Sequence, residues 1–195
     1  MRRVVITGAG CVGAAGIGTG PLRTALASDG PLGEVLEVEA AGGRKRPVRL
    51  ARLAPFDRQV FLPPRKLRRM GELSQLWVIC CLMARSDAGW EGAGGVLPPP
   101  GKRGTFLGTG FGCVDTTWEY LEGMLRDGAA TANPFLFAES VANAPAGHSA
   151  IELDTRGADI TLTCGDASAA AALEMAARAI RDGRLEMACC GGVEL

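Results

Sequence analysis

The chain has 195 residues, of which 47% are hydrophobic and only 5% aromatic, and it contains 28 glycines. This length and composition suffice for one domain whose core is built from small and aliphatic side chains. The 21 basic and 21 acidic side chains cancel, which argues against a nucleic-acid partner and against binding to an anionic membrane. Two short basic runs, residues 44–46 and 65–69, are predicted to be solvated surface.

The cysteines indicate the redox setting and the possible metal chemistry. They include two adjacent pairs and no CxxC or Cys/His ligand spacing, so neither a disulfide framework nor a metal site is predicted. No apolar run approaches the roughly 18–20 residues of a membrane span, and glycines interrupt the start of the chain before a signal-peptide core forms. We expect a soluble cytoplasmic protein with small, buried thiols. These are Cys11, Cys80, Cys81, Cys113, Cys164, Cys189 and Cys190.

The hydrophobic pattern predicts short apolar strands alternating with helices. Apolar rather than alternating strands are typical of an α/β domain around a largely parallel sheet. Residues 31–64 and 90–100 are expected to be loop or hairpin insertions. The remaining predicted elements, in chain order, are a strand at 3–7, a glycine loop at 8–20, helices at 21–28 and 65–88, a strand at 103–108, a helix at 116–125, a loop with a helix at 133–148, a strand at 159–163, a helix at 168–181 and a strand at 186–190.

The alanine-rich helix at residues 168–181 carries few charges in its first thirteen positions. A helix that is apolar on most sides is buried between layers rather than lying on a surface. We therefore expect it to be covered on several sides. A chain of this length does not easily provide that much cover, which points to a missing half or to a partner.

A GxGxxG pattern follows the first predicted strand, at Gly8–Gly13. In a dinucleotide-binding unit the helix begins inside this motif and its N-terminus holds the pyrophosphate. Here Gly16, Gly18 and Gly20 follow, and they would disrupt the first turns of such a helix. We interpret the motif as a tight structural turn, and a dinucleotide-binding oxidoreductase remains an outside alternative.

Two other patterns lack the partners that chemistry would need. The glycine cluster at residues 108–112 (GTGFG) has no Lys-Ser/Thr of a phosphate-binding loop, so close backbone packing is the simpler interpretation. His148 is the chain's only histidine and has no Asp or Cys at catalytic spacing. We expect it to have a packing role.

Six segments together resemble the successive signatures of β-ketoacyl-acyl-carrier-protein synthases. The resemblance covers the whole chain in order, and it implies a thiolase-like half with βαβαβαββ order and a mixed, mainly parallel sheet between helical layers. Residues 1–195 would form a single N-terminal-half domain, without a cofactor. The segments are MRRVVITGAG (1–10), RKLRRMGELSQ (65–75), GTGFG (108–112), NAPAGH (143–148), RG (156–157) and GGVE (191–194).

The family's acyl-accepting cysteine lies in a TACSSG motif at the start of a buried helix, where the helix N-terminus lowers the thiol pKa. Ungapped counting from Gly157 and from Gly191 places this nucleophile at the same position, Asp166. The resemblance thus implies that Asp166 replaces the cysteine. Cys164, two residues upstream, is the fallback nucleophile.

The resemblance also implies what else is missing. The family's pair of basic catalytic residues comes from the second half of its members, and His148 matches a non-catalytic position. We therefore expect a catalytically inactive, chain-length-factor-type subunit in fatty-acid, type II polyketide or aryl-polyene biosynthesis. By analogy, the dimer interface and acyl tunnel would lie near Phe111, Thr117, Trp118, Phe135 and Asn143.

The resemblance is compatible with three interpretations of the chain's function. In the first, the chain pairs with a full-length ketosynthase, and acyl carrier protein is a possible further partner. In the second, it pairs with itself as a homodimer. In the third, it is the N-terminal portion of an active synthase that uses Cys164. The sequence does not fix the pathway, the acyl-chain length or whether the natural chain ends at Leu195.

Overall fold

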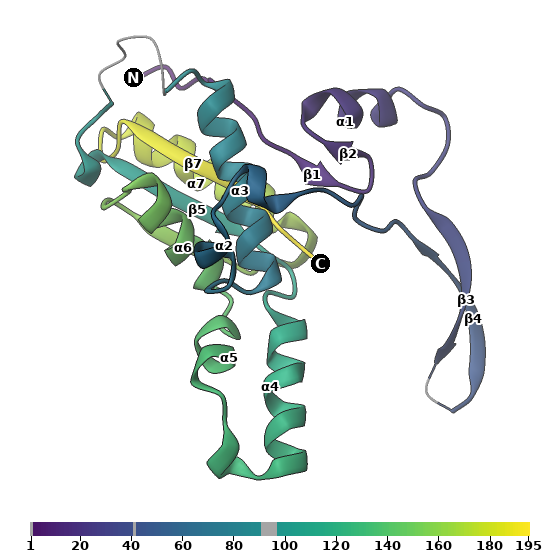
Figure 1. The fold of residues 1–195 in the computed structure, drawn as a ribbon. Coiled ribbons are helices and arrows are strands. Elements are labelled where there is room, and N and C mark those ends of the chain that lie inside the picture. The colour runs from purple at the N-terminus through teal and green to yellow at the C-terminus, as the bar shows by residue number, and fades with distance from the viewer. Residues whose placement is uncertain (1, 41, 91–96) are drawn as a thin grey trace.

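A computed structural model of the chain describes residues 2–40, 42–90 and 97–195 (Figure 1). Its centre is a three-stranded sheet in which β5 (Arg103–Gly108) lies between β6 (Asp159–Leu162) and β7 (Met187–Gly192). Both pairings are parallel, and Phe106 lies opposite Ile160 on one side and Cys190 on the other. Residues 104–108 are all buried, as expected for a parallel strand covered on both faces.

Helices cover the two faces of this sheet. On one face α3 (Glu72–Asp87) and α6 (Ala144–Leu153) pack around Trp77 and Leu107. On the other face α7 (Ser168–Arg181) packs Ala172 and Ala176 against Phe106. Successive residues of β5 thus enter opposite cores, because strand side chains alternate. The predicted α/β layering is confirmed.

Helix α7 is covered on one side by the rest of the chain. Its buried face consists of Ser168, Ala172, Ala176 and Ala179, spaced as one helix stripe. Leu173 and Met175 remain 46% and 38% exposed. Within the described residues, the sheet covers only one side of the helix, and the expectation that a missing half or a partner covers the other sides stays a prediction.

The predicted first strand, residues 3–7, does not join the sheet. Its backbone forms no ladder among the described residues, and Val5 and Ile6 are 62% and 78% exposed. A cavity of about 390 Å³ lies between residues 4–12, the edge of β7 and the facing sides of α3 and α7. The prediction of a strand at residues 3–7 is wrong, because a strand also needs a neighbouring strand to pair with.

The glycine-rich segment at residues 8–20 comes next, and close packing against α3 determines its path. A Cβ atom at Gly8 would lie 2.3 Å from the carbonyl oxygen of Ala84, and one at Gly10 would lie 2.1 Å from that of Cys80. Only glycine permits this approach to α3. The chain then makes a short hairpin, β1 (Val12–Gly13) with β2 (Gly16–Ile17), before α1 (Thr19–Leu26).

Two segments project from the body (Figure 1). The first is an antiparallel hairpin of β3 (Glu34–Ala40) and β4 (Arg44–Leu50), within the stretch expected to be an insertion. The second, called the arm, comprises residues 114–139, with α4 (Val114–Asp127), a short turn η3 (Ala129–Thr131) and α5 (Pro134–Glu139).

The predicted helix at residues 65–88 is divided in two. A single turn, α2 (Pro64–Leu67), follows the turn η1 (Arg58–Val60), and α3 begins after Gly71, whose backbone is extended. The predicted connection at 90–100 lies largely outside the described residues, apart from the turn η2 (Pro100–Lys102) at its end. No helix in the described ranges is long and apolar enough to cross a membrane.

Candidate functional site

Asp166 lies in a short turn, η4 (Gly165–Ala167), that leads directly into α7. We call residues 164–168 the α7 turn. Ser168 fixes this turn, because its buried hydroxyl accepts a hydrogen bond from the N–H of Cys164 (2.8 Å) and lies 2.9 Å from the carbonyl oxygen of Thr109. A Cβ at Gly108 would lie 2.3 Å from the carbonyl carbon of Ser168, so glycine is required there. Cys164 and Asp166 are both exposed.

The glycine loop at residues 108–112 lies beside the α7 turn and holds the carboxylate of Glu194. This carboxylate accepts the N–H of Gly110 at 2.6 Å and that of Phe111 at 3.1 Å. Paired backbone N–H groups of this kind can stabilise an oxyanion in acyl transfer. Here both are occupied by Glu194, which ties the last residues of the chain to the loop.

Most of the thiols are held in their neutral form. Burial raises the pKa of Cys80 and Cys190 to about 11, and the pKa of Cys81 also lies well above its ordinary value because of burial and the neighbouring Cys189. Cys113 also has a pKa of about 11, through burial and the charges of Glu139 and Glu194. Since the thiolate is the nucleophilic form, these four are poor nucleophiles at neutral pH.

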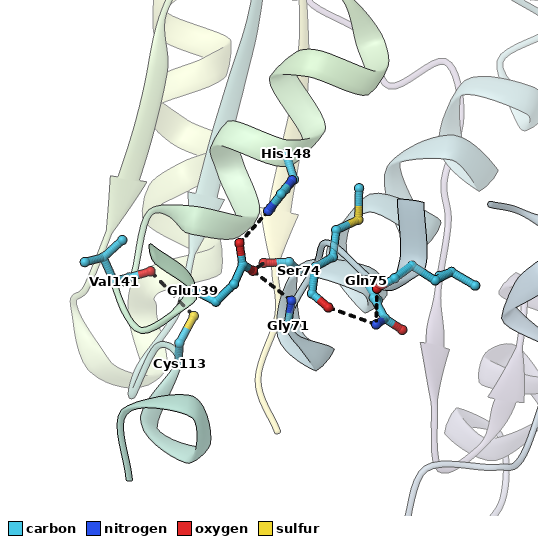
Figure 2. A network of polar contacts seen from close by, with 9 residues as sticks. Gly71, Ser74, Gln75, Cys113, Glu139, Val141 and His148 are labelled. Carbon is cyan, nitrogen blue, oxygen red and sulfur yellow. Dashed lines mark hydrogen bonds and ion pairs between the residues drawn. The ribbon is translucent and has the colours of Figure 1, made fainter. Parts of the chain in front are cut away.

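A buried carboxylate, Glu139, is the centre of the network in Figure 2. It is 5% exposed and accepts three hydrogen bonds, from the N–H of Gly71 (2.8 Å), the hydroxyl of Ser74 (2.9 Å) and Nε2 of His148 (2.6 Å). Burial raises its pKa, but the bonds from His148, Gly71 and Ser74 together with the charge of His148 outweigh this, so that the pKa lies below 4.5.

His148 and Cys113 do not form a catalytic pair. Figure 2 shows Glu139 between them, and the Cys113 thiol instead donates to the carbonyl oxygen of Val141 at 3.5 Å. A nucleophile needs a base within hydrogen-bond reach. The packing role expected for His148 fits the hydrogen bond that it makes to Glu139.

The five residues expected near an interface do not converge on one pocket. Phe111, Trp118 and Phe135 are 80%, 70% and 41% exposed. Thr117 instead lies inside the arm, where its hydroxyl reaches the carbonyl oxygen of Ser140 (3.1 Å), and Asn143 is the N-cap residue of α6.

One face of α4 is an exposed apolar stripe. Its residues recur at helical spacing, and all lie between 43% and 88% exposed. Contiguous apolar surface of this kind typically marks a protein–protein contact. The α4 stripe consists of Val114, Trp118, Leu121 and Leu125.

The GxGxxG pattern at Gly8–Gly13 is not followed directly by the helix that a dinucleotide-binding site requires. Residues 8–13 lead into the β1–β2 hairpin rather than into a helix, and α1 begins only at Thr19. A helix N-terminus is therefore not placed to hold a pyrophosphate at this motif. Within residues 2–40, 42–90 and 97–195, no group of three or more His, Cys, Asp or Glu side chains could hold a metal ion.

The family model for the N-terminal domain of β-ketoacyl synthases matches residues 1–195. The chain belongs to this family. No curated protein sequence matches it. A solved β-ketoacyl synthase from Burkholderia phymatum STM815 is 26% identical with a TM-score of 0.73, and the match covers 95% of this chain and 45% of that one.

Two further solved structures show the same fold at lower identity. The ishigamide ketosynthase/chain length factor is 23% identical (TM-score 0.76; 97% of this chain, 52% of that one). A type II polyketide synthase acyl-carrier protein in complex with its ketosynthase bound to the hexaketide is 20% identical (TM-score 0.78; 100% and 52%). The expected thiolase-like ketosynthase fold is confirmed, and this chain spans about half the length of these relatives.

Sequence reasoning placed Asp166 in this β-ketoacyl synthase domain but missed three residues that support the site. Ser168 and Glu194 fix the α7 turn and the glycine loop, and Glu139 joins the arm to the body. Except for the bond between Glu139 and His148, the contacts that matter join groups 59 to 84 positions apart, so spacing could not reveal them. The one local signal was the glycine cluster, which indicated a close backbone approach.

Proposed function

We propose that this chain is a non-condensing, chain-length-factor-type ketosynthase subunit in fatty-acid, type II polyketide or aryl-polyene biosynthesis. The observation that carries the proposal is Asp166. It stands in the turn before α7, and counting from the two flanking motifs implies that this is the position of the family's acyl-accepting cysteine. The turn retains its supports, while the group that would accept the acyl chain is a carboxylate.

The chemistry of a carboxylate explains the expected inactivity. When a thiolate attacks a thioester, the product is another thioester of similar energy. Attack by a carboxylate would instead give a mixed anhydride, which is higher in energy than the thioester. The backbone N–H groups of Gly110 and Phe111 are also occupied by Glu194. Neither the nucleophile nor these donors suit acyl transfer.

Acylation is tested by incubating the purified chain with acyl-loaded carrier protein and measuring intact mass. We expect the mass to remain unchanged. Cys164 is the specific alternative because it is exposed in the same turn, so Cys164→Ala is the matched variant. An acyl adduct that forms on the wild-type chain and disappears in Cys164→Ala would overturn the proposal in favour of an active half-enzyme.

The arm supports pairing with a full-length ketosynthase. The α4 stripe lies on a segment that projects from the body (Figure 1), and burying it would remove a large apolar surface from water. Two of the similar structures are described as a ketosynthase/chain length factor and as a ketosynthase with its acyl-carrier protein. We propose that a ketosynthase covers the stripe and that acyl carrier protein reaches this chain within that complex.

Light scattering of the chain with and without a type II ketosynthase separates the partner choices. A one-to-one complex supports the heterodimer. A dimer of the chain alone that does not exchange with the ketosynthase favours the homodimer. A stable monomer in both samples would refute pairing through the arm.

A further inference from the structure

Glu139 is the last residue of α5 and lies where the arm returns to the body. Four elements meet around its carboxylate: the start of α3, the segment before α4, the end of α5 and α6 (Figure 2). The side chain is 5% exposed although it carries a charge. Charged groups are rarely buried to this extent unless they are paired, because leaving water is costly.

The side chain of Glu139 links the arm to two helices of the body. Three hydrogen bonds from α3, its cap Gly71 and α6 end on Glu139. The other polar contact near the base, from Thr117 to Ser140, joins one side of the arm to the other. Tyr120 and Phe137 likewise pack together within the arm, with ring centroids 5.8 Å apart.

The three donors reach Glu139 from two separate helices. Gly71 and Ser74 fix it to the first turn of α3, and His148 fixes it to α6. Ser74 is itself 1% exposed, so its hydroxyl has no water to replace a lost partner. Removing the carboxylate would leave buried donors unsatisfied, which costs more than an exposed hydrogen bond contributes.

We propose that Glu139 is a positioning residue that latches the arm in one orientation, so that the α4 stripe is presented to the partner. The proposal rests on the proposed function only where it speaks of a partner. The latch itself is a property of the isolated chain. Without it, the two arm helices would pivot about their connections at residues 112–113 and 140–143.

The latch has a defined dependence on pH. The groups facing Glu139 are His148 from α6, Ser74 and Gly71 from α3, and Cys113 from the segment before α4. Because the folded pKa of Glu139 lies below its ordinary 4.5, its stabilising effect is complete above that value. The effect is lost as the pH falls through the lowered pKa.

Hydrogen exchange of the purified chain tests the latch directly. At neutral pH, Glu139→Gln should speed exchange of the α4 and α5 amides on the order of tenfold or more, the loss expected for a charged, buried hydrogen bond. Exchange in β5 should not change. Glu152→Gln is the matched control, since Glu152 is also shielded and ion-paired, with Lys66 at 2.5 Å, but lies away from the arm.

A graded series keeps the test decisive if Glu139→Gln fails to fold. His148→Gln retains a donor for Glu139 and should loosen the arm less than His148→Ala does. Acidification should loosen the wild-type arm but leave the Glu139→Gln arm unchanged. Wild-type exchange rates in the arm of Glu139→Gln would overturn the latch, whether or not a partner binds. If Glu139→Gln loosens the arm but the wild-type chain, with its arm latched, binds no ketosynthase, the latch stands and the proposed partner is refuted.

Discussion

Trp118 offers the sharpest test of the α4 stripe, because it is the largest side chain in it and is 70% exposed. A tryptophan buries on the order of 200 Å² when fully covered, so about 140 Å² of it remains for a partner to cover. At about 25 cal/mol per Å², covering this area contributes up to about 3.5 kcal/mol. Trp118→Ala should therefore weaken ketosynthase binding by about 2–3 kcal/mol, or roughly 30- to 150-fold.

The same arithmetic predicts that Trp118→Ala has a smaller effect on the folding stability of the isolated chain. The covered part of Trp118, about 60 Å², contributes roughly 1.5 kcal/mol to folding at most. Calorimetric titration with the ketosynthase and urea unfolding of the chain measure the two quantities separately. The control is Ile151→Ala, which removes a side chain that is 76% exposed on α6. Equal loss of affinity in both variants, or none in Trp118→Ala, would refute the assignment of the stripe.

The remaining predictions concern the α7 turn, the core and the thiols. Asp166→Cys in the 195-residue chain should show no condensation with acyl- and malonyl-carrier protein, because the family resemblance implies that the basic catalytic residues lie outside residues 1–195; measurable elongation would contradict this. Phe106→Ala should lower the free energy of unfolding by about 3–5 kcal/mol in urea titrations, since the ring is 1% exposed and packs against Ala172 and Ala176 of α7. Iodoacetamide at pH 7.5, followed by peptide mass mapping, should label the exposed Cys164 well before Cys113, whose pKa is about 11; equal labelling would contradict the burial argument.

The sequence predicted the sheet and its helices best where the pattern was local. The strand at residues 103–108 and the helix at 168–181 have the predicted bounds, because apolar runs and capping residues are read within a few positions. The strand at residues 3–7 failed for a non-local reason. Its β-branched side chains favour extended backbone, but the edge of β7 is separated from it by the cavity.

The candidate site likewise contains one residue that the sequence located and several long-range contacts that it did not predict. Asp166 was located by counting from two flanking motifs, and the structure places it in the turn before α7. The carboxylate of Glu194 bonds to Gly110 across 84 positions, and the N–H of Gly71 bonds to Glu139 across 68, which no spacing in a single sequence shows. The break in the predicted helix at Gly71 was missed as well. The extended backbone there lets the N–H of Gly71 donate to Glu139, a distant residue that the local helical pattern does not reveal.

The proposed aspartate in place of a nucleophile costs this fold little stability. Asp166 is exposed, and the supports of its turn come from Gly108, Ser168 and Glu194 rather than from its own side chain. Exposed substitutions away from such supports usually change stability by less than about 0.5 kcal/mol. The shape of the turn and its chemistry are therefore separable. Under the proposed function, a subunit that shapes a partner's acyl site retains the shape of the α7 turn without an acyl-accepting side chain.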